Sequence, residues 1–425
     1  MDQGLKNHGV RVTSAAVGIN LALGILYTWS VVSNEVPAEW GWTHAAKAWP
    51  YSIACLVFSL MMVPAGRLQD KLGPRLVASI GGLLVGLGLI LCSMTTLPLG
   101  YMLGFGLLAG SGIGFGYAAA TPPAVKWFPS ARTGLVAGIV VSGFGLASVY
   151  AAPLARWLIH CEGIPTTMLC LGIAFLVVVV CLAQLLAAPP KGYVPAGPKG
   201  GSAAAAGRKT AARDYSPLEM LGTPQFYLLW FMYACGAGAG LMIISKLATI
   251  AKEQAGYQQG FVLVAAMAVG NGAGRIIAGS LSDRLGRLHT LLGCFLFQAV
   301  LMILVSLAQK DTPLGTVPAL VVLSALMGAN YGANLSLFPS VTKDYYGLRN
   351  FGVNYGLVFT AWGIGGFVLA LLAGWLRDSF GHYSYSYYVS FVLLLLAGLV
   401  TFAVKSPVAA AVEPPSPAAP APWPK

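Results

Sequence analysis

Charged side chains are scarce in this sequence, where Asp, Glu, Lys and Arg together make up 9% of 425 residues. A soluble domain carries about 25% charged residues, so this chain lacks the charge needed to cover a water-facing surface. Hydrophobic residues make up 57% of the chain, and its mean hydropathy is +0.74. These values predict an integral membrane protein whose segments face lipid or one another.

Signatures of metal, nucleotide and catalytic sites are also lacking. The seven cysteines form no C-x-x-C pair and lie mostly in apolar runs, so we expect neither a disulfide framework nor a metal site. The glycine-rich stretches Gly110–Gly116 and Gly270–Gly274 do not follow strands, which argues against a nucleotide or other cofactor. Close helix packing and bending during transport explain them better. The five histidines fall at segment ends or in loops. We therefore do not expect an enzyme.

Apolar runs near the roughly 20 residues needed to cross a bilayer recur along the chain. There are twelve, over residues 10–34, 46–66, 76–96, 98–123, 133–159, 166–188, 225–250, 257–280, 288–308, 315–340, 350–376 and 385–404. The alternating pattern of a barrel strand is missing, so we expect helices. The sequence predicts an all-α membrane protein with two six-helix halves, which extend over 1–188 and 225–404. A Pro/Gly-rich linker, 189–224, joins them, and a disordered Pro/Ala-rich tail, 405–425, follows.

The basic residues are distributed unevenly between the two ends of the predicted helices. If the N-terminus is cytoplasmic, 18 of the 25 Lys and Arg residues fall on the cytoplasmic side and six, Lys246 among them, on the outer side. The remaining one is Arg275. This bias follows the positive-inside rule, and it predicts a plasma (inner) membrane protein with both termini in the cytoplasm. It also explains the net charge of +12 without a nucleic-acid partner.

The two halves repeat a short motif. The pattern Gly-x-Leu-x-Asp-[Lys/Arg]-x-Gly occurs at 66–73 and again at 279–286, 213 residues later. Pro122, Lys126 and Arg132 recur in the second half as Pro339, Lys343 and Arg349. A duplicated six-helix unit places a substrate site at the interface of the halves, near the middle of the membrane.

This motif, present in both halves of a twelve-helix chain, resembles the major facilitator superfamily, whose members are alternating-access transporters. Leu26–Ser30, Gly222–Phe226 and Arg349–Gly352 resemble segments of the oxalate–formate antiporter family. That family and the monocarboxylate transporters also share an arginine in the eighth helix, at the position of Arg275. The resemblance implies the major facilitator fold and a carboxylate as substrate.

The same resemblance implies a gate at the cytoplasmic ends of two helices. The residues concerned are Asp70 with Arg67 in the first half, and Asp283 with Arg284 in the second. In the superfamily such aspartates face a helix N-terminus, where the helix macrodipole favours an anion. The alternative is that they are ordinary loop charges.

Arg275 is the residue from which we predict the substrate site. It lies in an apolar run eight residues before Asp283, which on a helix places it about 12 Å deeper in the membrane. A charge at that depth costs roughly 3 to over 10 kcal/mol. None of the 13 acidic residues falls in the middle of a span, so we expect Arg275 to bind a substrate carboxylate. Asn271 lies one turn away and either helps this contact or packs between helices.

Four tyrosines, Tyr27, Tyr117, Tyr331 and Tyr355, align with aromatic residues that enclose the substrate in the carboxylate carriers. The resemblance implies that they line the cavity, with ordinary packing as the alternative. A tyrosine offers an apolar wall and a hydroxyl, which suits a small molecule with a methyl end and a carboxylate end. Asn354 is a further candidate for the same site.

Two positions at which this sequence departs from the two families narrow the range of candidate substrates. Val358 stands where the oxalate carriers have a lysine, and Val31 stands where animal monocarboxylate transporters have one. One buried arginine pairs with one carboxylate, and a second carboxylate would lack a partner. We therefore predict a transporter of a small monocarboxylate, L-lactate or pyruvate-like, with a proton as the coupling ion. The alternatives are a carboxylate exchanger and, from another class, a membrane sensor without flux. Asn271 replaces an aspartate of the animal proteins, so their proton relay is not carried over.

Overall fold

A computed structural model describes residues 8–128, 133–190, 193, 214–347 and 350–407, without the side chains of a few residues inside helices, Asp70 and Asp283 among them. The described chain is helical throughout. Its elements are α1 (Gly9–Leu23), η1 (Gly24–Thr28), α2 (Trp29–Asn34), η2 (Ala38–Trp40), α3 (His44–Leu72), α4 (Pro74–Ser93), α5 (Pro98–Tyr101), η3 (Met102–Ala109), α6 (Gly110–Lys126), α7 (Thr133–Ala183), α8 (Pro217–Leu221), α9 (Pro224–Ala255), α10 (Gly260–Leu285), α11 (Arg287–Leu307), η6 (Pro313–Gly315), α12 (Val317–Tyr346), α13 (Phe351–Phe380) and α14 (Ser384–Ala403).

Eleven helical stretches among the described residues are long and apolar enough to cross a membrane, and α7 is long enough to do so twice. A straight helix of its 51 residues would measure about 76 Å, more than twice the roughly 30 Å hydrocarbon core. Gly163 interrupts α7 with φ 77° and ψ 169°, where two helices meet. This φ lies in the left-handed region, which glycine adopts without steric cost. The two parts of α7 correspond to the predicted runs 133–159 and 166–188, and the predicted all-helical membrane fold is confirmed.

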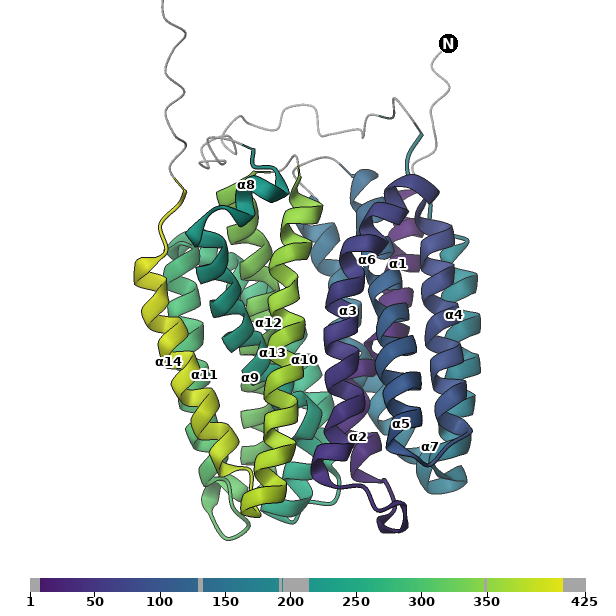
Figure 1. Cartoon of the computed structure of the whole chain (residues 1–425), viewed down its shortest axis with the longest axis vertical. Coiled ribbons are helices and arrows are strands. Elements are labelled where there is room, and N and C mark those ends of the chain that lie inside the picture. Colours follow the sequence, from purple (N-terminus) through teal and green to yellow (C-terminus); the bar gives the residue numbers. More distant parts are fainter. Residues whose placement is uncertain (1–7, 129–132, 191–192, 194–213, 348–349, 408–425) are drawn as a thin grey trace, which may run out of the picture.

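The helices form two bundles that stand side by side, α1–α7 in one and α9–α14 in the other (Figure 1). Helix α1 begins and α14 ends at the same face of the molecule, which we call the terminal face; the opposite face is the distal face. Across the boundary, α3 packs against α13 and α7 packs against α10. The interface predicted between the two halves therefore has these four helices at its centre.

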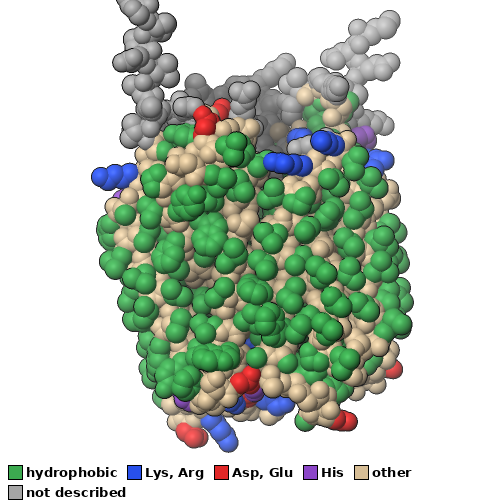
Figure 2. Space-filling view, viewed as in Figure 1, with side chains coloured by type: hydrophobic (Ala, Val, Ile, Leu, Met, Phe, Trp, Pro, Cys, Tyr) green, Lys and Arg blue, Asp and Glu red, His purple; other side chains and the backbone are tan. Residues whose placement is uncertain are grey.

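The surface is that of a membrane protein. Hydrophobic side chains cover the middle of the molecule, and the charged side chains gather toward its two ends (Figure 2). Large apolar residues such as Ile276, Trp375 and Phe402 are 57–70% exposed, which would be costly in water and is favourable against lipid tails. The chain is thus an integral membrane protein.

Glycines bring α10 and α12 into backbone contact. A Cβ atom at Gly270 or Gly274 would overlap the carbonyl groups of Ala325 or Ala329 in α12. Reciprocally, a Cβ at Gly332 would overlap the backbone of Asn271 in α10. Small residues allow such close approach between membrane helices. The predicted role of Gly270–Gly274 in helix packing is thus confirmed, and it places Arg275 on a helix held against α12.

The first predicted span is not a continuous α-helix, which the apolar pattern did not reveal. Its central residues Gly24–Thr28 form a 3-10 stretch between α1 and α2. At this point the chain approaches α7 closely, because a Cβ at Gly24 would lie 2.5 Å from the carbonyl oxygen of Phe144. Tyr27 belongs to this stretch, so the local change of helix type sets where its side chain points.

Candidate functional site

Arg275 lies in α10 at the boundary between the halves, and its side chain is 8% exposed. Its Nε donates a hydrogen bond to Asn271 Oδ1 at 3.2 Å, and its Nη1 donates to the carbonyl oxygen of Val141 in α7 at 2.8 Å. Both partners are neutral. Among the side chains that the structure describes, none forms an ion pair with this guanidinium, so its positive charge stays uncompensated within the protein.

Two nitrogens of this pair that carry N–H groups lie close to α7, and Arg275 also contacts the Tyr117 hydroxyl. The two nitrogens are Arg275 Nη2 and Asn271 Nδ2, which would lie 3.2 Å and 3.3 Å from a Cβ atom built on Gly145 of α7. The two nitrogens therefore converge on the same small region, which Gly145 leaves unfilled. A charged donor and an amide donor pointing to one place form a suitable donor set for a carboxylate.

A small cavity lies next to Arg275. We call it the arginine cavity; it is lined by Tyr27, Phe58, Tyr117, Phe144, Arg275, Leu335, Phe359 and Trp362. Both halves contribute to it, and aromatic rings form most of its wall. Three of the residues predicted from sequence, Arg275, Tyr27 and Tyr117, meet here.

A second small cavity is bordered by Asn271. We call it the aliphatic cavity; its lining is Tyr27, Ser148, Ile244, Leu247, Val264, Met267, Ala268 and Asn271. Tyr27 lines both cavities. The N–H donors of Arg275 and Asn271 thus lie beside an aromatic compartment and an aliphatic one.

Tyr27 and Tyr331 join the halves at this level. Their hydroxyl oxygens lie 2.7 Å apart, and Trp362 Nε1 donates to the Tyr331 hydroxyl at 2.8 Å. Tyr27 comes from the first half, whereas Tyr331 and Trp362 come from the second. Tyr331 is fully buried, and it holds Tyr27 in place without lining either cavity.

Tyr355 and Asn354 are not among the residues that meet at Arg275. Tyr355 stands behind the wall of the arginine cavity, with its ring 5.7 Å from that of Phe359 and its hydroxyl 3.4 Å from that of Tyr233. Asn354 donates instead to the carbonyl oxygen of Tyr215 at 3.1 Å. It occupies the first turn of α13, near the terminal face, and the cavity residues of that helix lie further along it.

Val358 and Val31, which stand where relatives have lysines, are both buried, at 0% and 2% exposed. The structure nevertheless corrects the count of buried cations. Lys246 was placed on the outer side from the sequence, yet it is only 3% exposed in α9. Its Nζ donates to the carbonyl oxygen of His44 at 3.3 Å. Lys246 follows a run of apolar residues near the end of the helix, and its burial arises from packing against the other half.

The predicted cytoplasmic gate falls at the terminal ends of α3 and α10. Arg67 and Arg284 are exposed there. The side chains of Asp70 and Asp283 lie outside the described residues, although both positions belong to these helices. The gating role of the four residues stays a prediction.

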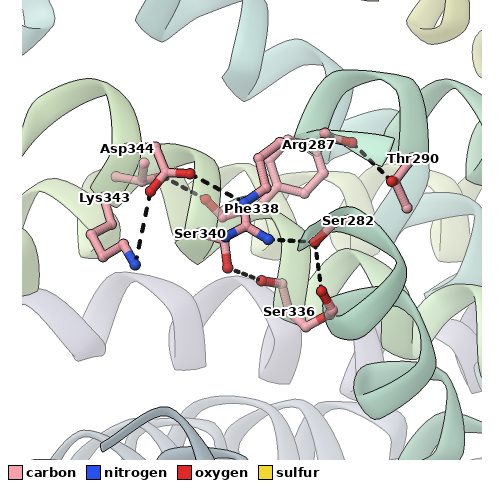
Figure 3. Close-up of polar contacts among 11 residues, drawn as sticks. Ser282, Arg287, Thr290, Ser336, Phe338, Ser340, Lys343 and Asp344 are labelled. Atoms are coloured by element: carbon pink, nitrogen blue, oxygen red, sulfur yellow. Dashed lines mark hydrogen bonds and ion pairs between the residues drawn. The ribbon is translucent and has the colours of Figure 1, made fainter. Parts of the chain in front are cut away.

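A polar clamp next to Asp283 was missed by the sequence analysis (Figure 3). Arg287 Nε donates to Asp344 Oδ2 at 3.1 Å, and Arg287 Nη1 donates to Ser282 Oγ. Lys343 Nζ lies 3.8 Å from the other Asp344 oxygen. These contacts tie α10, α11 and α12 together within the second half. Arg287 and Asp344 are 57 residues apart, so no helical spacing connects them in the sequence.

The comparison with known families agrees with this geometry. The family model described as "Major Facilitator Superfamily" matches residues 14–270 and 250–425. The chain belongs to the Major Facilitator Superfamily. As a member of this superfamily it is a transporter and not an enzyme.

Two relatives in the superfamily bear out the resemblance to carboxylate carriers. The chain is 27% identical to the "Oxalate:formate antiporter" of Oxalobacter formigenes, over 80% of this chain and 77% of that one. It is 28% identical to "Monocarboxylate transporter 11" of Mus musculus, over 90% of this chain and 84% of that one. A crystal structure of a bacterial homolog to the human lysosomal transporter Spinster has a similar fold, with a TM-score of 0.69 and 17% identity. That match covers 94% of this chain and 98% of the other.

Proposed function

We propose that this superfamily member is a secondary active transporter of a small monocarboxylate, L-lactate or pyruvate-like, coupled to protons. The observation that carries the proposal is the uncompensated guanidinium of Arg275 between the halves, with its Nη2 and the Nδ2 of Asn271 converging beside Gly145. A buried cation without a counter-ion is unfavourable. An anionic substrate would supply the missing negative charge and accept a hydrogen bond from each of the two donors.

The aliphatic cavity supports a monocarboxylate with a short apolar tail. Burying one methylene group there would contribute about 0.8 kcal/mol. A second carboxylate would instead meet Leu247, Val264 and Met267, at a cost of several kcal/mol without a partner. Lys246 does not supply that partner in this conformation, because its ammonium group is bonded to the His44 carbonyl.

Transport by alternating access requires that the halves separate on one face and then on the other. In this proposal Arg275 captures the carboxylate, and the neutralised site permits the halves to close around it. The charge bias favours a cytoplasmic terminal face, and we propose that the membrane is the plasma membrane. The motif residues Asp70, Arg67, Asp283 and Arg284 would then gate the cytoplasmic side.

A carboxylate exchanger is the second candidate. Two observations favour it: the 27% identity to the oxalate:formate antiporter, and the burial of Lys246 as a second cation one residue before Leu247 of the aliphatic cavity. A rearrangement that frees Lys246 would provide a partner for a second carboxylate. A sensor without flux is disfavoured by membership in a superfamily of transporters.

Reconstitution in proteoliposomes tests the proposal. Uptake of labelled L-lactate should rise when an inward proton gradient is imposed, and unlabelled pyruvate should compete while oxalate should not. Uptake that ignores the gradient and depends on internal carboxylate would establish exchange. Competition by oxalate as strong as by lactate would contradict the monocarboxylate assignment.

A further inference from the structure

Asp378, at the distal end of α13, binds the start of a helix in the other half. Its Oδ1 accepts a hydrogen bond from the backbone N–H of His44 at 3.0 Å, and its Oδ2 accepts one from Ala45 at 2.8 Å. These N–H groups belong to the first turn of α3 and have no partner within that helix. The helix macrodipole also favours a carboxylate at this point. A side chain of the second half therefore caps a helix of the first half.

The side chain of His44 adds further contacts between the halves. Its Nδ1 lies 3.1 Å from the Tyr383 hydroxyl, and its Nε2 lies 3.7 Å from Glu253 Oε1. Arg377 Nε donates to the other oxygen of Glu253 at 2.8 Å. We call this group the distal clasp; it consists of His44, Lys246, Glu253, Arg377, Asp378 and Tyr383. Only His44 comes from the first half, so all its side-chain and carbonyl contacts in the clasp cross the boundary.

The distal clasp lies between the distal face and the proposed carboxylate site. Helix α9 shows the order of the layers: Ile244 and Leu247 line the aliphatic cavity, and Glu253 follows near the end of the helix. Lys246, which directly precedes Leu247 on this helix, donates across the boundary to His44. A substrate entering from the distal face would have to pass the clasp to reach Asn271. Opening on this side requires that its contacts break.

The charges of the clasp predict how it responds to acid. The charged groups that face His44 are Lys246 and Glu253 from α9 and Arg377 and Asp378 from α13, and Lys47 of its own helix faces Glu253. These are three cations and two anions. Arg377 already neutralises Glu253 at 2.8 Å, closer than His44 at 3.7 Å. Burial of the His44 ring disfavours a proton there, the cations Arg377 and Lys246 add to this effect, and the attraction of Glu253 offsets it only in part.

We propose that the distal clasp is the gate on the distal side of the carboxylate site, and that protonation of His44 opens it. This proposal rests on the proposed function only for the identity of the substrate that passes the gate. If the distal face is the outer one, external acid opens the site to substrate, which is the direction that proton-linked uptake requires.

Distance measurements across the distal face test the gate. Nitroxide labels on Glu39→Cys in the first half and Asp311→Cys in the second, both exposed outside the clasp, would report opening by double electron–electron resonance. The seven native cysteines are replaced in this background. We expect a short distance at about pH 7.5 and a growing long-distance population at about pH 5.5, on either side of the usual histidine pKa of about 6.5. A distance distribution that does not change with pH would overturn the proposal.

Two variants assign the effect to named residues. Asp378→Asn should raise the ratio of open to closed molecules by about tenfold or more at both pH values, as expected for loss of a charged hydrogen-bond pair. His44→Gln should abolish the pH response. The matched controls are Glu162→Gln and His382→Gln, at exposed positions outside the clasp, which should behave as the parent. A closed Asp378→Asn variant, or a pH response retained in His44→Gln, would refute the assignment.

Lactate uptake in the same proteoliposomes separates this proposal from the function on which it rests. Opening as expected without any lactate uptake would leave the gate established and the substrate assignment wrong. Lactate uptake with a pH-independent distal distance would leave the transporter established and the gate wrong.

Discussion

The terminal and distal faces of this transporter are built on different principles. At the terminal face, the polar contacts described around Arg287 and Asp344 tie three helices of one half together. At the distal face, Asp378 and His44 tie one half to the other. The first arrangement stiffens a bundle, and the second resists separation of the bundles. Repeated sequence motifs mark the terminal face, whereas the contact that joins the halves occurs where no repeated motif is found.

The largest effect on lactate binding is expected at Arg275, which lies between the two faces. Arg275→Lys should weaken L-lactate binding by at least about 100-fold, because an ammonium group cannot reproduce the planar fork that contacts Asn271 and Val141. Isothermal titration of purified protein would measure the loss. The distance across the distal face should stay unchanged, which would separate substrate binding from the clasp.

A suitable control is Arg75→Lys. Arg75 also donates to a backbone carbonyl, that of Leu186 at 2.7 Å, and it lines neither cavity. Its substitution should leave lactate affinity unaltered. Retained lactate affinity in Arg275→Lys would contradict the binding role.

An intermediate effect on lactate transport is expected at Gly145, where α7 approaches the N–H donors of Arg275 and Asn271. A methyl group at Gly145 would lie 3.2 Å from Arg275 Nη2 and 3.3 Å from Asn271 Nδ2, so Gly145→Ala should displace both nitrogens. Overpacking of this kind costs about 1–3 kcal/mol, and we expect the KM for lactate to rise by about tenfold in uptake assays. Gly138→Ala in the same helix, where a Cβ meets nothing within 4 Å, is the matched control. Equal KM values for the two variants would exclude this positioning role.

The smallest effect is expected at the terminal face. Asp344→Asn should lower stability by less than about 1 kcal/mol, because the Arg287–Asp344 pair is partly exposed, at 15% and 29% for the two side chains. Thermal unfolding in detergent would show a small decrease in Tm. The distal distance should not change, because this clamp lies within one half. A change in that distance would show that the two faces are coupled, and the contrast drawn between them would then fail.

The features predicted correctly from the sequence are those that local patterns encode. Apolar runs predicted the crossings, and the repeated motif predicted the superfamily that the family comparison confirms. The glycines of Gly270–Gly274 predicted close packing, because a side chain at Gly270 or Gly274 would overlap α12. Arg275 stood out because a charge in an apolar run is rare.

The features that were missed depend on contacts between distant segments. His44 and Asp378 are 334 residues apart, and each sits at a helix end, where a charge needs no explanation. Lys246 follows apolar residues near a helix end, so burial and exposure were equally compatible with its position. Asn354 was a further candidate for the substrate site, but it lies in the first turn of α13, where its amide donates to the Tyr215 carbonyl instead. Tertiary contacts decided these cases, and periodicity carries no information about them.

The backbone contact between α10 and α12 has a consequence for the route of the substrate. Because glycines on both helices press against the carbonyl groups of the other, the two helices have no room to slide independently. Arg275 and Asn271 on α10 therefore keep their position relative to Tyr331 on α12 while the bundles move. The contacts to Val141 and Tyr27 belong to the other bundle and are the ones that break. If the substrate binds Arg275 as proposed, it stays with the second half while the first half moves to uncover it on one face and then on the other.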